Sequence, residues 1–323
     1  MGFLMIPFLK KLKFGQTILD IGPRWHKDKQ GTPTMGGFMF IIGTLVAVVV
    51  GYLLNRVNIN KDLTTFTTQN KVILLLSVIM ALGYAFIGFV DDYLKVVRKQ
   101  NEGLNERQKL VLQFIVAIGY IVALYIAGQK STIVWFPFIG QVDFGIFYYP
   151  LVVIGIVYMV NVVNLTDGVD GLCSSVTLMV ALGFIVISHL LGYSMMELLA
   201  AALAGGCIGF LFWNAYPAKV FMGDTGSLFL GGVVVALAFG LGIPVILIFM
   251  GIVYIVEGLT VMIQTMYFKY TRKKTGEGKR LFKMTPIHHH FEMLGWKENK
   301  IVIVFSLIQL IACAIGVLAV VRI

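Results

Sequence analysis

Long apolar runs, separated by short polar segments, occupy about half of the chain. Nine of these runs have 16 to 24 residues each, and a bilayer-spanning helix needs about 20. They do not alternate apolar and polar positions as the strands of a transmembrane β-barrel do, so the pattern predicts helices. The runs cover residues 38–54, 72–90, 110–127, 147–163, 172–191, 198–213, 228–244, 245–268 and 301–321.

Three shorter features complete the expected architecture. The run at residues 1–9 is too short to span alone, and we interpret it as the end of a first span. The segment 240–244, Gly-Leu-Gly-Ile-Pro, predicts a hairpin between two adjoining runs. Alternating residues around Trp135 and Asp143 predict a small β-hairpin on the outer face. The expected fold is therefore an all-α polytopic membrane protein of about ten transmembrane helices, the first one shortened, forming a single domain over residues 1–323.

Composition and charge agree with a membrane protein and set its orientation. The chain is 58% hydrophobic and only 13% charged, about half the charged fraction of soluble domains, which excludes a disordered chain or a conventional soluble enzyme. With residues 10–34 placed inside and the spans alternating, 21 of the 26 Lys and Arg residues fall inside. The positive-inside rule therefore accounts for the net charge of +10, and no nucleic-acid partner is needed to explain it.

The acidic residues are concentrated on the same side, where 12 of 16 fall. Asp91 and Asp92 follow an apolar run directly, and Lys95 would share their helix face if the helix continues. Two carboxylates beside a lysine can hold a hydrated Mg²⁺ and a phosphate together. The simpler interpretation is a polar helix end with one salt bridge.

Two further acidic motifs lie at inside span ends. Asn161, Asn164, Asp167 and Asp170 recur every third residue, with Gly168 among them, and capping of the next helix would explain only one or two of the four. Asp224, in Gly-Asp-Thr-Gly-Ser, opens a later run, where it could cap the helix or hold a metal or phosphate. Asn214 and Phe221 in the preceding loop offer a hydrogen-bonding group and a stacking group.

The last inside loop, residues 269–300, combines a basic cluster with three consecutive histidines, His288, His289 and His290. A helix would point these imidazoles in different directions, so they are not a zinc motif, and beside basic residues they suit a pyrophosphate ligand. Topology and contact with anionic membrane lipids account for most of the basic charge. Glu257, within the apolar run 245–268, is a functional candidate because ionisable groups are costly inside a membrane.

These motifs resemble those of the phospho-N-acetylmuramoyl-pentapeptide-transferase family, within the polyprenyl-phosphate N-acetylhexosamine-1-phosphate transferase superfamily. The acidic motifs are shared across the superfamily, whereas the Gly31–Gly37 segment and the His288–Glu292 run are more particular to this family. The resemblance extends over nearly the whole chain from about Lys10. Its other matching residues are Phe14-Gly15-Gln16, Gly22-Pro23, His26, Lys29, the Asp91–Lys95 motif, the 161–172 stripe, Asn214, Phe221, Gly223–Ser227 and Glu257.

The resemblance implies the reaction and its participants. Phospho-MurNAc-pentapeptide would pass from UDP-MurNAc-pentapeptide to undecaprenyl phosphate, giving lipid I and UMP, with Mg²⁺ as cofactor. The enzyme would be a multi-pass protein of the bacterial inner membrane with its active site facing the cytoplasm, and two copies could associate as a homodimer.

The resemblance also implies roles for individual residues. Asp224 would ligate Mg²⁺, Asp91 would deprotonate the polyprenyl phosphate or attack as a nucleophile, and Asp92 would support the metal and lysine network. His289 would join this catalytic group, with His288 and His290 in contact with the donor. The phosphates would be held by Lys29, Lys95 and Lys109. The nucleoside pocket would be lined by Asn161, Asn164, Asp167, Gly168, Asp170, Asn214 and Phe221.

Two other functions fit parts of the pattern. A sibling transferase that uses UDP-GlcNAc shares the acidic motifs, and only the Gly31–Gly37 and His288–Glu292 matches favour the MurNAc enzyme over it. An ion-coupled transporter would place charges near the bilayer midplane. Here only Glu257 lies that deep, whereas five aspartates are predicted at one membrane face.

Overall fold

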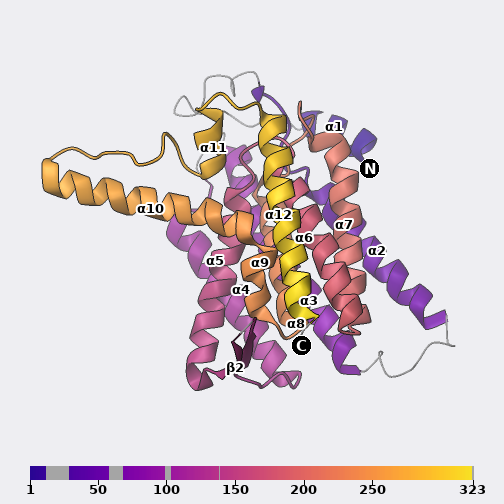
Figure 1. Ribbon diagram of the computed structural model, residues 1–323. Helices are drawn as coiled ribbons and strands as arrows, with labels where there is room; N and C mark the ends of the chain where they lie inside the picture. Colours follow the sequence, from indigo (N-terminus) through magenta and orange to yellow (C-terminus); the bar gives the residue numbers. More distant parts are fainter. Residues whose placement is uncertain (12–28, 58–67, 99–102, 138, 322–323) are drawn as a thin grey trace.

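The computed structural model describes residues 1–11, 29–57, 68–98, 103–137 and 139–321. Three parts of the family resemblance, Phe14-Gly15-Gln16, Gly22-Pro23 and His26, lie outside the described residues. Apart from one short β-hairpin, the regular structure of the described residues is helical, and most of the long helices stand side by side in one bundle (Figure 1).

The described helices confirm the all-α membrane fold. Eight are long and apolar enough to cross a membrane, and one pair of helices, bent by 84°, passes the same test of length and composition when taken together. The eight are α2 (Gly37–Val57), α3 (Thr68–Arg98), α4 (Glu106–Ile126), α5 (Tyr148–Leu165), α6 (Leu172–Leu190), α7 (Ser194–Asn214), α8 (Gly223–Gly240) and α12 (Glu298–Val320).

The short first helix, α1 (Gly2–Lys11), does not cross the bundle. It lies beside the end of α7, where the Phe3 ring meets the Trp213 ring edge-on with centroids 4.8 Å apart. We refer to this end of the bundle, where α3 and α7 end and α8 begins, as the upper end, after its place in Figure 1.

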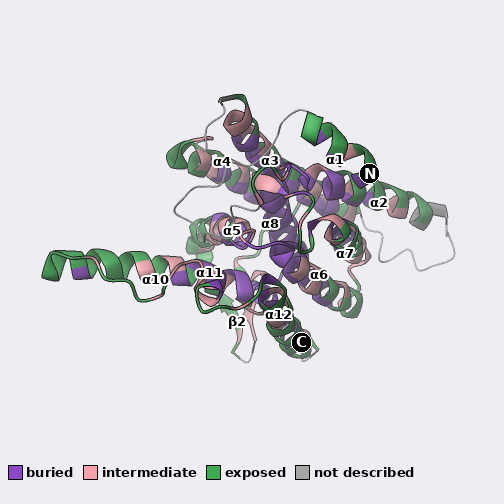
Figure 2. Ribbon diagram, turned by 90° about the horizontal axis from the view of Figure 1, so that it is seen from above, coloured by how far each residue is buried: buried purple, intermediate pink, exposed green. Residues whose placement is uncertain are grey.

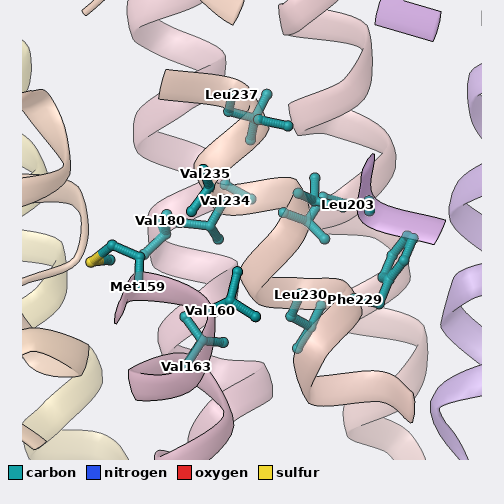
Figure 3. Packing of buried hydrophobic residues seen from close by; sticks show 14 of the residues in the cluster. Met159, Val160, Val163, Val180, Leu203, Phe229, Leu230, Val234, Val235 and Leu237 are labelled. Atoms are coloured by element: carbon teal, nitrogen blue, oxygen red, sulfur yellow. The ribbon is translucent and has the colours of Figure 1, made fainter. Parts of the chain in front are cut away.

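Helix α8 is the centre of the molecule. Every residue from Thr225 to Gly240 is buried, and the view from above shows α8 surrounded by the other spans (Figure 2). Its apolar side chains pack against residues of α5, α6 and α7, among them Val160, Val180 and Leu203 (Figure 3). Because α8 is apolar on all sides, burial within the bundle is the arrangement that its sequence favours.

The run at residues 245–268 does not form the single straight span that its length suggests. A 3₁₀ turn η4 (Pro244–Ile246) and α9 (Leu247–Met250) are followed by α10 (Ile252–Thr275), and the helix axis bends by 84° between them. The bend lies at Gly251, where a Cβ atom would stand 2.9 Å from the Leu247 carbonyl oxygen. As a result α10 leaves the bundle sideways instead of crossing it (Figures 1 and 2).

The lower end holds the predicted hairpins. Strands β1 (Ile133–Phe136) and β2 (Gly140–Asp143) pair antiparallel, with Ile133 opposite Asp143, and a 3₁₀ turn η3 (Gly145–Phe147) leads into α5. The 240–244 segment turns as expected, with Gly242 at a φ of 73°. At the upper end a short helix, α11 (Ile287–Glu292), precedes α12.

Candidate active site

Two lysines bring the carboxylates of α3 and α8 together at the upper end. The Lys95 ammonium lies 2.6 Å from a carboxylate oxygen of Asp91, one helical turn away, and 2.8 Å from Asp224. Lys109, from the first turn of α4, lies 3.0 Å from the same Asp224 oxygen. Lys95 is 34% exposed, Lys109 and Asp224 are each 19% exposed, and Asp91 is 4% exposed. Asp224 and the two lysines are therefore the members of this group that a ligand can reach most readily.

Asp92 has a different position from Asp91, although the two are adjacent. Its carboxylate accepts hydrogen bonds from the backbone amides of Asp224 and Thr225, at 3.1 and 2.9 Å, and from the Thr225 hydroxyl at 2.7 Å. Asp92 thus caps the first turn of α8 from the neighbouring helix, where a negative charge also favours the helix dipole. This arrangement leaves the Asp224 carboxylate free of a capping role.

A glycine lets the two helices approach this closely. A Cβ atom on Gly88 of α3 would stand 2.1 Å from the Asp224 carbonyl oxygen. Any larger residue would therefore push the first turn of α8 away from α3, and with it Asp224.

The polar stripe at the end of α5 divides among three places. Asn164 donates to Asp224 at 2.8 Å and to the Ser227 hydroxyl at 2.7 Å, so it belongs to the acidic site. Asn161, one turn deeper, exchanges hydrogen bonds with Gln113 of α4 instead. The other two residues of the stripe, Asp167 and Asp170, do not cap the next helix, because α6 begins after Gly171 without a side-chain cap.

Asp167 follows α5 and faces the negative side of the site. Burial of its carboxyl group and the charges of Asp224, Asp92 and Asp170 raise the pKa of Asp167 to about 8. At neutral pH this carboxyl is therefore largely protonated and can donate a hydrogen bond.

Asp170 forms a separate ionic cluster with Lys29 and Glu298. The Lys29 ammonium lies 2.8 Å from Asp170 and 2.6 Å from Glu298, and the other Asp170 oxygen accepts from the Ala218 amide. Burial lowers the pKa of Lys29, but hydrogen bonds and ion pairs with the two carboxylates outweigh burial and raise that pKa above its ordinary value. Asp170 and Glu298 thus neutralise the Lys29 charge. Lys29 therefore does not share the position of Lys95 and Lys109, which both lie beside Asp224.

The loop between α7 and α8 is held by Asn214 and by the Gly31–Gly37 segment. Asn214 is buried, donates to the Val220 carbonyl at 3.0 Å and accepts from the Ser174 hydroxyl at 3.2 Å. The Phe221 amide donates to the Pro33 carbonyl at 2.8 Å, and the Gly36 amide donates to the Phe221 carbonyl at 2.8 Å. Phe221 is only partly buried, so part of this residue is accessible to a ligand.

The three histidines of α11 point in different directions, as their spacing predicts. His288 is fully buried, with Nδ1 3.0 Å from Glu257 of α10, and a Cβ atom on Gly168 would clash with its Nε2. His289 lies 2.5 Å from Glu292, and His290 accepts from the Lys283 amide at 3.1 Å. His288 therefore connects α10 to the turn that carries Asp167.

The acidic group offers a suitable place for a divalent cation. Carboxylate oxygens of Asp91, Asp92 and Asp224 all lie within 4.8 Å of one another. Carboxylates, completed by water and phosphate oxygens, are the ligands that Mg²⁺ prefers. The residues present thus fit such an ion.

Comparisons with known proteins show the family of this chain. The profile of glycosyl transferase family 4 matches residues 72–242, which include Asp91, Asp92, Asp167 and Asp224. A phospho-N-acetylmuramoyl-pentapeptide-transferase from Clostridium perfringens (strain 13 / Type A) is 45% identical over 317 residues, which cover 98% of this chain and 93% of the relative. The chain belongs to the phospho-N-acetylmuramoyl-pentapeptide-transferase family. A transferase of the same name from Acetivibrio thermocellus is 42% identical over 323 residues, covering 99% of this chain and 91% of that protein. This member of the phospho-N-acetylmuramoyl-pentapeptide-transferase family is therefore an enzyme.

Two residues of this transferase were missed by the sequence analysis. Gln113 pairs with Asn161. The signal that could have identified Gln113 is the presence of a polar residue within the apolar run 110–127. Glu298 pairs with Lys29, which is 269 residues away in the chain. No local sequence pattern indicates that contact.

Proposed function

We propose that this protein transfers phospho-MurNAc-pentapeptide from UDP-MurNAc-pentapeptide to undecaprenyl phosphate, producing lipid I and UMP for peptidoglycan synthesis. An oxygen of the polyprenyl phosphate forms a bond to the phosphorus attached to the sugar. The bond from that phosphorus to the oxygen of UMP breaks, and UMP leaves with the electron pair. The observation that supports this most directly is the group of three carboxylates and two lysines at one end of a membrane bundle, in a chain of this family.

The acidic group provides the positions that this chemistry needs. Asp91 would take the proton of the polyprenyl phosphate, or attack the donor itself to form a covalent intermediate. Lys95 and Lys109 would exchange part of their contact with Asp224 for the phosphate oxygens of the substrates. Asp92 would act through α8, by holding the first turn of that helix in place.

Asp224, supported by Asp91 and Asp92, would hold Mg²⁺, which when bound supplies charge neutralisation for the phosphates. Asn164 orients the Asp224 carboxylate by donating to its second oxygen.

The donor would lie between the acidic group and the surrounding loops. Phe221 would stack on uracil, and Asp167, Gly168 and Asn164 would line the pocket. His289 and His290 would approach the donor from α11. His288 was also expected to contact the donor, but it is fully buried between Glu257 and Gly168, so it would act indirectly, by positioning the turn that carries Asp167. Four further residues would act indirectly, because their hydrogen-bond or ion-pair partners lie outside the acidic group: Asn161, Asn214, Asp170 and Lys29.

The upper end would face the cytoplasm of a bacterium, with the protein in the inner membrane. A soluble nucleotide donor and a lipid acceptor can meet only at such a boundary. A homodimer is compatible with this arrangement.

The decisive assay measures UMP release from purified protein given undecaprenyl phosphate and Mg²⁺, with either UDP-MurNAc-pentapeptide or UDP-GlcNAc as donor. We expect turnover with the first donor only. Turnover with UDP-GlcNAc alone would assign the protein to the sibling activity, and turnover with neither would reject the proposed function.

A further inference from the structure

Helix α10 is unusual among the long helices because most of it has no neighbour among the described helices. From Met262 to Tyr270, all residues except Gln264 are exposed. Both views show this part of the helix extending away from the bundle (Figures 1 and 2).

The segment that returns from α10 to α11, residues 276–286, covers one side of α10. Gln264 accepts from the amides of Leu281 and Phe282, at 2.9 and 3.0 Å, and donates to the Phe282 carbonyl at 3.1 Å. Seven residues later, and so on the same side, the Thr271 hydroxyl accepts from the Lys279 amide at 2.8 Å. The polar groups of this side are thus bonded within the protein.

The side away from the return segment carries a stripe of large apolar residues. They recur at helical spacing and are 40% to 60% exposed: Leu259, Met262, Ile263, Met266 and Tyr270. Such a stripe is costly in water, and none of the described residues covers it.

Basic residues gather where this stripe ends. Arg272, Lys273 and Lys274 form the last turn of α10, and the return segment adds Lys279 and Arg280, all exposed, with Glu277 as the only acid among them. The Lys274 ammonium lies 5.9 Å from the centre of the Tyr270 ring. A tyrosine beside a lysine is the pairing found where a protein meets lipid headgroups.

We propose that α10 and the return segment form a binding surface for anionic phospholipids, with the apolar stripe among the acyl chains and the basic cluster on the phosphates. Topology alone would require positive charge at this membrane face, but not an apolar stripe beside it on a helix that leaves the bundle. A helix with one apolar side and one basic end is suited to the membrane interface. This inference does not depend on the substrate of the transferase.

The test places a fluorophore on the stripe and quenchers in the lipid. The three native cysteines are buried, so Met266→Cys can be labelled selectively with bimane. The labelled protein is placed in nanodiscs containing equal fractions of either brominated-chain phosphatidylglycerol or brominated-chain phosphatidylcholine. We expect both lipids to quench the label, with at least twofold stronger quenching by phosphatidylglycerol.

Paired charge variants identify the source of the preference. Lys273→Gln/Lys274→Gln should remove the excess quenching by phosphatidylglycerol and keep the quenching by phosphatidylcholine. Lys10→Gln/Lys11→Gln, which removes the same charge elsewhere on the upper end, should leave the preference unchanged. The proposal is overturned if both lipids quench the label equally in the protein that carries no charge substitution. It is also overturned if both charge variants lose the preference for phosphatidylglycerol to the same extent. The absence of quenching by either lipid, the result expected if water or a second copy of the chain covers the stripe, overturns it as well.

Discussion

The three aspartates of the acidic site differ in their exposure and in their hydrogen-bond partners, although they are the same type of residue. Asp224 is reachable and contacts both lysines and Asn164, Asp91 is nearly closed off, and Asp92 is occupied by the α8 amides. The three aspartates therefore give different expectations when they are changed.

Replacing Asp224 should remove catalysis without unfolding the protein. Asp224→Asn keeps the size and one acceptor oxygen, replaces the other oxygen with an NH2 donor, and removes the charge that the lysines and a cation require. We expect UMP release to fall about 10³-fold or more, with an unchanged elution profile and melting temperature within a few degrees. Asp143→Asn, on the exposed hairpin at the lower end, is the matched control and should be fully active. Near-normal turnover of Asp224→Asn would exclude the metal assignment.

Asp91 tests the acid–base or nucleophilic step. Asp91→Asn cannot accept the proton of the acceptor or attack the donor, so we expect no UMP release above background at any pH from 6 to 9. Retained activity would show that Asp91 is neither the essential base nor the nucleophile. The amide can still accept from the Leu104 backbone, as the carboxylate does at 2.8 Å, so the fold should be preserved.

Asp167 should make stability depend on pH. Its folded-state pKa is about 8, whereas an unfolded aspartate titrates near 4. Between these values the folded state binds a proton that the unfolded state lacks, so stability falls as pH rises through this window. We expect Asp167→Asn to lose less melting temperature between pH 5.5 and 8 than the parent protein. An identical pH dependence in the two proteins would contradict the protonated state of Asp167.

At the scale of helices, the contact of α3 with the first turn of α8 positions the site. Gly88 permits the close approach and Asp92 fixes it through three hydrogen bonds. Each of these features can be tested separately from the catalytic groups.

Gly88→Ala should reduce activity because its Cβ atom would overlap the Asp224 carbonyl oxygen. We expect at least a tenfold loss of UMP release together with a lower melting temperature. Gly119→Ala is the matched control: it also lies in a helix, but its Cβ atom would have no neighbour within 4 Å. That substitution should be neutral or stabilise the protein by about 0.5–1 kcal/mol. Equal effects of the two substitutions would show that the close approach is unimportant.

Asp92→Ala should act mainly on stability, since it leaves two amides and a hydroxyl of α8 without an acceptor. The expected cost is about 1–3 kcal/mol of unfolding free energy, visible as a lower melting temperature in detergent. Asp92→Asn retains one acceptor oxygen and should recover part of the loss. A melting temperature of Asp92→Ala equal to that of the parent would exclude the capping role.

At the scale of the whole molecule, the sequence predicts the fold well because a bilayer imposes a simple rule on helix length and polarity. The spans, the hairpin around Trp135 and the diverging histidines all follow from local patterns. The bend at Gly251 was not predicted, because a glycine within an apolar run is ordinary in membrane helices.

The partners of the site residues were less predictable for a physical reason. Motif spacing shows which residues share a helix face, and it correctly placed Lys95 beside Asp91. It does not show which distant segment completes each contact, so the pairing of Lys29 with Glu298 and the capping of α8 by Asp92 required the three-dimensional structure.

The capping of α8 by a residue of α3 has a consequence for how the protein is made. The donors that satisfy Asp92 lie 132 and 133 residues further along the chain. At roughly 5–20 residues per second of synthesis, the ribosome delivers them about 7–26 s after Asp92. During that interval the Asp92 carboxylate of the nascent α3 has none of its protein hydrogen-bond donors. The capped first turn of α8, and with it the acidic site, therefore forms only late in synthesis.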